Sequence, residues 1–332
     1  MTNNTEFKAW RVEEQGGEYV GAEKTLNTSD LPEGDVLIRV THSSLNYKDA
    51  LSASGNKGVT RSFPHTPGID AAGEVVESAT GTPKEGSPVI VTGYDLGMNT
   101  DGGFGEYIRV PAGWCVPMPS GWNARTAMIY GTAGLTAGLC IQKLLTMGAK
   151  PAQGKVAVSG ASGAVGSVAV ELLSKLGFDV VAISGKADHA DDLKALGAKE
   201  VLGRETLAEE KKPMVKPIFA NAVDTVGGGP LAELLKQILP GGSVSCCGLV
   251  AGPGLQTTVL PFILRGVNLL GVDSVEIPLA EKEAVWKKFA GEWACPKTEA
   301  SARDIGRGEL DRALKAFLKG ESSGKIVLDH SK

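Results

Sequence analysis

Residues 155–167, with the sequence KVAVSGASGAVGS, decide the fold of this chain. The β-branched run at residues 156–159 stops at a glycine-rich turn, and residues 167–176 continue at helical spacing. Gly177 is a typical helix-ending residue, and the apolar run 179–183 that follows it indicates a second strand. Strand, tight turn, helix and strand form a βαβ unit, so we expect a doubly wound parallel sheet.

The glycine turn is suited to a phosphate group. Gly163 and Gly166 let the backbone approach a pyrophosphate closely, and the helix behind them points its positive end at the same place. A GxxGxxG pattern alone is a weak signal and often marks an ordinary loop. Because a strand precedes this one and a helix and second strand follow it, we predict that it binds a dinucleotide.

The residues after the second strand indicate which dinucleotide fits. An NAD-preferring site places an acidic residue there, where its carboxylate binds the ribose 2′-hydroxyl. This chain has Ser184, Gly185 and Lys186 instead. A hydroxyl, an open backbone and an ammonium accommodate a 2′-phosphate that a carboxylate would repel. We therefore predict NADPH as the cofactor.

Size and composition limit the class of protein. The chain has 332 residues, of which 42% are hydrophobic, so two domains with large cores are expected. It has no apolar run of about 18 residues and no signal-peptide pattern, which favours a cytoplasmic protein without a membrane span. The net charge of -4, without a Lys/Arg block, argues against nucleic-acid binding.

The cysteines and histidines are scattered along the chain. No CxxC pair is present among the five cysteines, and the four histidines lie far apart in sequence. We expect free thiols and no metal site. Cys246 and Cys247 lie in a buried-strand pattern and are interpreted as small core residues.

The remaining periodicity suggests two kinds of domain. In the first third, short strands predict a mostly β domain with a partly open barrel; they are residues 7–11, 36–41, 71–77, 89–92 and 107–110. A helix is expected at 125–145. After the glycine turn, helices are expected at 190–196, 231–239 and 310–318, and strands at 200–202, 219–223, 243–247, 268–272 and 325–328.

Several motifs occur in one order along the chain. Besides the glycine turn they are NYKD at 46–49, PGIDAAG at 67–73, DGGFGEY at 101–107, YGTAG at 130–134 and PFILRGV at 261–267. Together they resemble the zinc-free, quinone-oxidoreductase-like branch of the medium-chain dehydrogenases/reductases, and within it the NADPH-dependent acrylyl-CoA reductases. The resemblance spans nearly the whole chain. It implies an α/β fold with a GroES-like barrel, formed by residues 1–125 with 300–332, and an NADP-binding Rossmann domain of residues 126–299.

The resemblance also bears on metals. Zinc-dependent relatives carry a cysteine where Asn46 stands, and a histidine and a glutamate where Ile69 and Asp70 stand. They also have a four-cysteine lobe near residues 90–110, a stretch that contains no cysteine here. The resemblance therefore implies that both zinc sites are absent. Alcohol oxidation is disfavoured, because that reaction needs the metal to polarise the alkoxide.

Cofactor contacts are implied residue by residue. Ser162, Gly163, Ala164 and Val165 correspond to the pyrophosphate site, Ser184, Gly185 and Lys186 to the 2′-phosphate site, Arg204 to the adenosine end, and Leu249, Ile263 and Ser274 to the nicotinamide end. For Arg204, a solvated surface arginine is the alternative. Relatives carry Asn where Gly320 stands, so an amide contact to the cofactor is expected to be lost or replaced.

Tyr47 and Asp49, in the NYKD motif, are the candidate catalytic residues. Reducing an α,β-unsaturated thioester requires a hydride at the β carbon, a donor at the carbonyl oxygen and a proton at the α carbon. We expect Tyr47 near the nicotinamide, where it binds the ribose or donates a proton; packing alone is the alternative. Asp49 either orients Tyr47 or Lys48, or caps the turn.

The leading hypothesis is NADPH-dependent reduction of the C=C bond of acrylyl-CoA, or a similar short 2-enoyl-CoA, by metal-free hydride transfer. An NADPH:quinone oxidoreductase is the first alternative, and a non-catalytic NADPH-binding redox sensor is an alternative of another class. Lys57, Arg61 and Arg265 are possible cations for the CoA phosphates, although sequence does not place them. The resemblance also implies a homodimer that joins sheet edges near residues 268–273.

Overall fold

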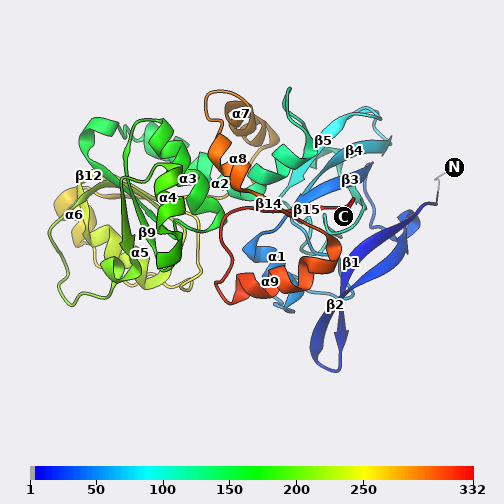
Figure 1. Ribbon diagram of the computed structural model, residues 1–332, viewed down its shortest axis with the longest axis horizontal. Coiled ribbons are helices and arrows are strands. Elements are labelled where there is room, and N and C mark those ends of the chain that lie inside the picture. The colour runs from blue at the N-terminus through cyan, green and yellow to red at the C-terminus, as the bar shows by residue number, and fades with distance from the viewer. Residues whose placement is uncertain (1–3) are drawn as a thin grey trace. The chain divides into compact units, whose positions relative to one another are not determined.

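The computed structural model describes residues 4–332 and divides the chain into two compact units, which are treated separately (Figure 1). The first unit contains Met1–Thr132, Ser274–Gly291 and Ser301–Lys332. The second contains Ala133–Asp273 and Glu292–Ala300. The domain bounds 1–125 with 300–332 and 126–299 stay a prediction about the family's domains. The first compact unit extends to Thr132 rather than to residue 125, and it also includes residues 274–291.

The first unit is mostly β. Its strands are β1 (Glu6–Gln15), β2 (Glu18–Asn27), β3 (Val36–Ser44), β4 (Asp70–Ser78), β5 (Pro88–Thr92), β6 (Tyr107–Val110), β7 (Val116–Pro117), β14 (Arg303–Ile305) and β15 (Ile326–Asp329). Its helices are α1 (Tyr47–Ala53), α7 (Leu279–Phe289) and α9 (Leu310–Leu318), with 3₁₀ turns at Thr28–Asp30, Ala112–Trp114 and Arg307–Glu309. A sheet runs in the order β14-β15-β3-β4-β5-β7, with β6 beside β3, and β1 and β2 form a separate hairpin.

The five strands predicted in the first third are confirmed as β1, β3, β4, β5 and β6. Apolar residues of β3, β4 and β6, such as Val40, Val75 and Ile108, form one core of the unit. Strand β2 was missed by the sequence prediction because its burial alternates only weakly and its residues are largely exposed. It is held by its antiparallel pairing with β1 rather than by a buried apolar face.

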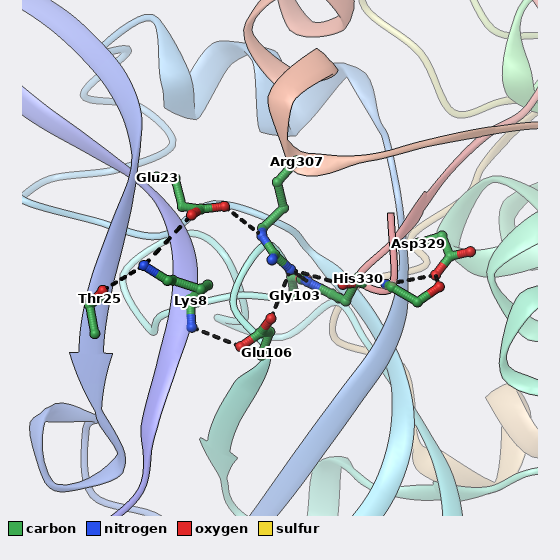
Figure 2. Close-up of polar contacts among 9 residues, drawn as sticks. Lys8, Glu23, Thr25, Gly103, Glu106, Arg307, Asp329 and His330 are labelled. Carbon is green, nitrogen blue, oxygen red and sulfur yellow. Dashed lines mark hydrogen bonds and ion pairs between the residues drawn. The ribbon is translucent and has the colours of Figure 1, made fainter.

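The C-terminal segment, Ser301–Lys332, belongs to the first unit. Strand β15 pairs antiparallel with β3, so that Val327 lies opposite Ser44. Figure 2 shows Arg307 among three residues that are far apart in sequence: it binds the Glu23 carboxylate at 3.0 Å, the Glu106 carboxylate at 2.9 Å and the His330 carbonyl oxygen at 3.1 Å. Burial lowers the pKa of His330 to about 4. The neutral ring therefore donates from Nε2 to the Gly103 carbonyl oxygen, 2.9 Å away, and accepts from Arg307 at Nδ1.

The second unit is a parallel α/β sheet. Its strands are β8 (Lys155–Ser159), β9 (Asp179–Ser184), β10 (Glu200–Gly203), β11 (Phe219–Asp224), β12 (Ile238–Cys246) and β13 (Asn268–Gly271). Its helices are α3 (Ala164–Lys175), α4 (Ala190–Leu196), α5 (Gly228–Lys236), α6 (Leu260–Arg265) and α8 (Pro296–Ser301), with 3₁₀ turns at Pro151–Gln153, Ala187–His189 and Arg204–Leu207. Helix α2 (Ala124–Thr146) begins in the first unit and ends in the second.

The strand order of this sheet is β10-β9-β8-β11-β12-β13, with parallel pairing throughout and helices on both sides (Figure 1). The order reverses between β8 and β11. In doubly wound sheets, ligands bind beside the carboxyl ends of the strands at such a switch point. The glycine turn follows β8 and therefore lies at this point.

One predicted helix ends too late. The sequence predicted a helix over 231–239, but α5 ends at Lys236 and β12 already begins at Ile238. Ile238 pairs with Phe219 of β11 and is fully buried, and the register between the two strands shifts after that pair. The pairing of a buried apolar residue thus outweighs the helical spacing, and the predicted strand 243–247 becomes the longer β12.

Candidate cofactor and active site

The glycine turn is fixed by two of its glycines. Gly160 has a φ of 63°, and a Cβ added there would lie 2.3 Å from Thr225 Oγ1. A Cβ on Gly166 would lie 2.3 Å from the Gly160 carbonyl oxygen. Real Cβ atoms do not approach so closely, so any side chain at either position would displace its neighbours. Gly160, which the sequence reasoning did not single out, is thus as restricted as Gly166.

Gly163 has a different role in the turn. Its φ is -77°, and an added Cβ would meet only the Gly160 carbonyl oxygen, at 3.2 Å. It precedes α3, whose first residues are Ala164 and Val165, and both are half-buried like Ser162. The first N–H groups of a helix have no acceptor within it and carry the positive end of the helix dipole. The four predicted pyrophosphate residues therefore lie together at a helix N-terminus, where an anion is stabilised.

The predicted 2′-phosphate residues meet at the end of β9. Ser184 Oγ lies 3.0 Å from Ser162 Oγ and accepts a hydrogen bond from the Lys186 backbone N–H at 3.1 Å. A Cβ added to Gly185 would lie 3.0 Å from the Arg204 Nε atom, so the guanidinium packs directly over this glycine. Hydroxyl groups and two cationic residues therefore surround one strand end, which suits a phosphate. The neighbouring Glu205 carboxylate lies against Gly203.

The residues predicted at the nicotinamide end are distributed differently. Leu249 and Ile263 belong to the second unit and are 57% and 69% exposed, whereas Ser274 is buried in the first unit. Their contact with the cofactor stays a prediction. Gly320, where relatives carry Asn, has a φ of 69° just after α9. Glycine and asparagine are the residues that most readily adopt this conformation at a helix end.

In the first unit, the NYKD motif forms the start of α1. Asp49 is fully buried, and its carboxylate accepts hydrogen bonds from the Asn46 N–H at 2.7 Å and the Ile69 N–H at 2.8 Å. It therefore caps the helix and ties it to the chain just before β4. Tyr47 is the first residue of α1 and is half-buried, and its hydroxyl makes no hydrogen bond with residues 4–332.

A second buried carboxylate, Asp70, joins three motifs. It accepts hydrogen bonds from the Thr132 hydroxyl at 2.6 Å, the Thr132 N–H at 2.9 Å and the Asn46 side-chain amide at 2.9 Å, and from the Ser44 hydroxyl. Gly131 has a φ of 44°, and a Cβ there would lie 2.6 Å from an Asp70 oxygen. The glycine therefore lets α2 bend so that the Thr132 N–H reaches this carboxylate. Sequence reasoning used these motifs as family markers and did not predict that they meet.

Burial perturbs two ionisable groups in this region. It raises the pKa of Asp49 to about 7; the Ile69 and Asn46 N–H groups oppose the rise, and the charge of Asp70 adds to it. Burial also lowers the pKa of the Lys325 ammonium to about 8, against the attraction of Asp70 and Asp49. The sequence offered no signal for Lys325 beyond a cation directly before an apolar strand.

The Asp49 carboxyl should make stability depend on pH. Because its folded-state pKa of about 7 exceeds the ordinary 3.8, its contribution to stability is complete below pH 4 and is lost as the pH rises through about 7. The isosteric Asp49→Asn variant removes this titration. We expect the free energy of unfolding of the wild type, minus that of the variant, to fall between pH 5 and pH 8 in urea titrations. A difference that rises over this range would contradict the assignment.

The cations considered for CoA phosphates are mostly engaged. The Arg265 guanidinium donates to the carbonyl oxygens of Val215 at 2.5 Å and Lys236 at 2.7 Å. Lys57 lies over the Phe63 ring, with Nζ 4.8 Å from the centroid. Arg61 is exposed in the same loop. Arg265 is therefore a structural residue of the second unit, and Lys57 and Arg61 stay candidates.

Residues 4–332 contain neither a metal-ligand cluster nor a helix suited to a membrane. No three His, Cys, Asp or Glu residues in this range gather as a metal site would require. All five cysteines are free thiols. None of the helices described in this range is both long enough and apolar enough to cross a membrane.

Two family descriptions match the chain. "Alcohol dehydrogenase GroES-like domain" matches residues 32–120, and "Zinc-binding dehydrogenase" matches residues 164–290. The Probable acrylyl-CoA reductase AcuI of Escherichia coli is 44% identical over 97% of this chain and 99% of its own length. The chain belongs to the medium-chain dehydrogenases/reductases. The predicted α/β fold, with a GroES-like domain and a Rossmann-like parallel sheet, is confirmed.

Further relatives of this medium-chain dehydrogenase/reductase carry different names and cofactors. The Putative quinone oxidoreductase YhfP of Bacillus subtilis is 42% identical over 98% of this chain and 99% of its own length. The yhdH oxidoreductase of Salmonella enterica, solved with NADP, is 42% identical over 97% of this chain and 99% of that one, with a TM-score of 0.94. The structure of Bacillus subtilis yhfP has NAD bound and is 42% identical over 98% and 99%, also with a TM-score of 0.94.

The zinc in one family description does not match the residues of this chain. At the positions where zinc-dependent members carry ligands, the chain has Asn46, Ile69 and Asp70. The Asn46 amide donates to Asp70, and Ile69 is an apolar buried residue. An amide donor and an alkyl group do not ligate Zn²⁺, so a polar hydrogen-bonded cluster takes the place of that set.

Proposed function

We propose that this enzyme reduces the C=C bond of acrylyl-CoA, or of a similar short 2-enoyl-CoA, with NADPH. The observation that carries this assignment is the 44% identity with an acrylyl-CoA reductase over almost the full length of both chains. The hydrogen-bonded NYKD segment and the phosphate-binding features of the second unit support it. A reductase of this kind acts on a CH–CH group.

The cofactor is NADPH, and when bound it supplies the hydride. Its pyrophosphate would be held at the N-terminus of α3, by the segment 162–165. Its 2′-phosphate would lie among Ser184, Lys186 and Arg204, around the end of β9. One relative has been solved with NAD, the unphosphorylated dinucleotide, bound. Titration with both cofactors therefore tests the preference.

Tyr47 is proposed as the group that supplies a proton to the substrate or binds the nicotinamide ribose. Its hydroxyl is not engaged by residues 4–332, and the Asn46–Asp49 contact fixes the first turn of α1 that carries it. A phenol held in this way donates from Oη without a metal. Asp49 acts through that turn, as a cap, and its catalytic assignment stays a proposal.

Replacing Tyr47 by phenylalanine should lower kcat about tenfold or more, because general acid catalysis typically contributes at least that factor. The phenyl ring keeps the packing and loses only the hydroxyl. Steady-state NADPH oxidation with an enoyl-CoA measures the effect, and NADPH fluorescence titration reports the cofactor affinity. Unchanged kcat and affinity would leave Tyr47 with packing alone.

The alternative acceptor is a quinone, which a relative's name suggests. Acrylyl-CoA, crotonyl-CoA and a soluble quinone should therefore be compared side by side with NADPH. We expect kcat/KM to be highest for acrylyl-CoA. A higher value for the quinone would replace the proposed substrate, and no turnover with any of them would favour the NADPH-binding redox sensor.

A homodimer in the cytoplasm is part of the proposal. Strand β13 is the edge of the six-stranded sheet, and an unpaired edge can join a second copy. Val259, Ile263 and Leu264, just before it in the chain, are more than 60% exposed. Gel filtration with light scattering tests the dimer, and a monomer mass would contradict it. The free thiols suit a reducing compartment.

A further inference from the structure

Lys325 is a buried cation that the proposed chemistry does not use. It immediately precedes β15, whose antiparallel register with β3, continued by two residues, places Lys325 opposite Asn46. The Leu45 N–H donates to the Ile326 carbonyl oxygen at 3.1 Å and fixes this neighbourhood. The Lys325 side chain is 2% exposed, and its Nζ makes no hydrogen bond with residues 4–332.

An ammonium in this state needs a compensating charge. Moving a charged group out of water is costly, and attraction to a nearby opposite charge is what offsets this cost. Asn46, which lies opposite Lys325, donates its backbone N–H to Asp49 of α1 and its side-chain amide to Asp70 of β4. Both carboxylates attract the charge of Lys325. Since neither makes a direct hydrogen bond to Nζ, the ammonium acts on both carboxylates through its field.

Another lysine of the same unit shows that burial alone does not produce this arrangement. Lys282 of α7 is also fully buried, but its Nζ donates to the carbonyl oxygens of Thr92 at 2.7 Å and Val275 at 2.9 Å. It also lies 3.4 Å from the centroid of the Tyr94 ring. Lys282 is therefore held by dipoles and a ring, whereas Lys325 faces carboxylates.

We propose that Lys325 is a positioning residue, which balances the charge of Asp49 and Asp70 and thereby holds the start of α1, with Tyr47, in place. Without it, two negative charges would share a buried site, which favours protonation of one of them. Asp49 is fully buried and accepts from two backbone N–H groups, so it is the carboxyl at which the loss of the cation should be measured. Protonation of Asp49 removes the negative charge at which the N–H groups of Asn46 and Ile69 are directed, so both hydrogen bonds weaken and hold the first turn of α1 less firmly.

The test compares Lys325→Met with Lys282→Met, two matched losses of a buried ammonium. The first readout is the ¹³C NMR titration of the Asp49 carboxyl carbon, which requires no turnover. We expect its midpoint to rise by about 1 pH unit or more in Lys325→Met, and to stay in place in Lys282→Met. An unmoved midpoint in Lys325→Met would overturn the proposal.

The second readout rests on the proposed function, because it uses enoyl-CoA reduction. In Lys325→Met we expect kcat at pH 7 to fall about fivefold, because a midpoint raised by about 1 unit leaves about a fifth as much ionised Asp49 at that pH. We expect kcat to recover as the pH is raised toward about 9, with NADPH affinity within about twofold. A large loss of NADPH affinity with an unmoved Asp49 midpoint would mean that Lys325 contacts the cofactor directly, and would overturn the proposal. If the wild type reduces no enoyl-CoA, the function fails while the titration still decides the role of Lys325.

A double variant covers the case in which Lys325→Met does not fold. Asp49→Asn removes the charge that Lys325 balances, so the loss of thermal stability on Lys325→Met should be smaller in the Asp49→Asn background than in the wild type. We expect the double variant to fold even if the single one does not. Equal losses in both backgrounds, or a double variant that also fails to fold, would overturn the coupling.

Discussion

Replacing Ser184 by aspartate should lower kcat/KM with NADPH by about 100-fold and raise it with NADH. The new carboxylate would lie at the end of β9, next to Ser162 and the Lys186 backbone, where the 2′-phosphate is proposed to bind. There it repels a phosphate but accepts hydrogen bonds from the two hydroxyls of an unphosphorylated ribose. Steady-state kinetics with both cofactors measure the change.

Ser184→Ala is the control for this exchange. It removes the hydroxyl contact with Ser162 without adding charge. We therefore expect kcat/KM with NADPH to fall about tenfold or less, and kcat/KM with NADH to change little. A Ser184→Asp variant that keeps the wild-type ratio of the two cofactors would show that the 2′-phosphate lies elsewhere. The proposed roles of Lys186 and Arg204 would then be lost as well.

Replacing Asp70 by alanine should lower the free energy of unfolding by about 3–5 kcal/mol. The change leaves the buried donors of Ser44, Asn46 and Thr132 without their shared acceptor and removes one of the two charges that face Lys325. Urea denaturation at pH 7.5 measures the loss. The variant would also lack the hydrogen bond from the Thr132 N–H, which the non-helical backbone at Gly131 allows in the wild type.

Asp329→Ala offers a matched control in the same unit. Its carboxylate accepts hydrogen bonds from Ser331, two residues away. Because Asp329 is only half-buried and its partner is a neighbouring residue at the chain surface, we expect a loss of about 1 kcal/mol, well below that of Asp70→Ala. If Asp70→Ala were no more destabilising than Asp329→Ala, the buried cluster would not be what joins α1, β4 and α2.

Local contacts were predictable from the sequence, and distant ones were not. The glycine turn, Ser184 and Lys186 lie within a single βαβ unit, where spacing alone determines which residues meet. The Asp70 cluster joins residues 44, 46, 70 and 132, and no periodicity relates positions so far apart. Lys325 is still more remote in sequence, and it comes close to this cluster only because β15, which follows it, pairs with β3.

The errors in element bounds have the same origin. Helix α4 and helix α9 were predicted with the bounds they have, because their apolar spacing and their end signals agree. The helix predicted over 231–239 failed where Ile238 pairs with Phe219, a contact that lies outside the local window. Strand β2 was missed because its stability comes from its neighbour β1.

The place of β15 in the sheet of the first unit affects how the chain folds as it is made. Residues 326–329 pair with β3, and between them the ribosome must produce the entire second unit. The strands of the parallel sheet can therefore pair with one another while the edge of β3 still lacks β15. The edge of β3 therefore stays unpaired from early in synthesis until almost the whole chain has been made, and an unpaired strand edge is prone to aggregation.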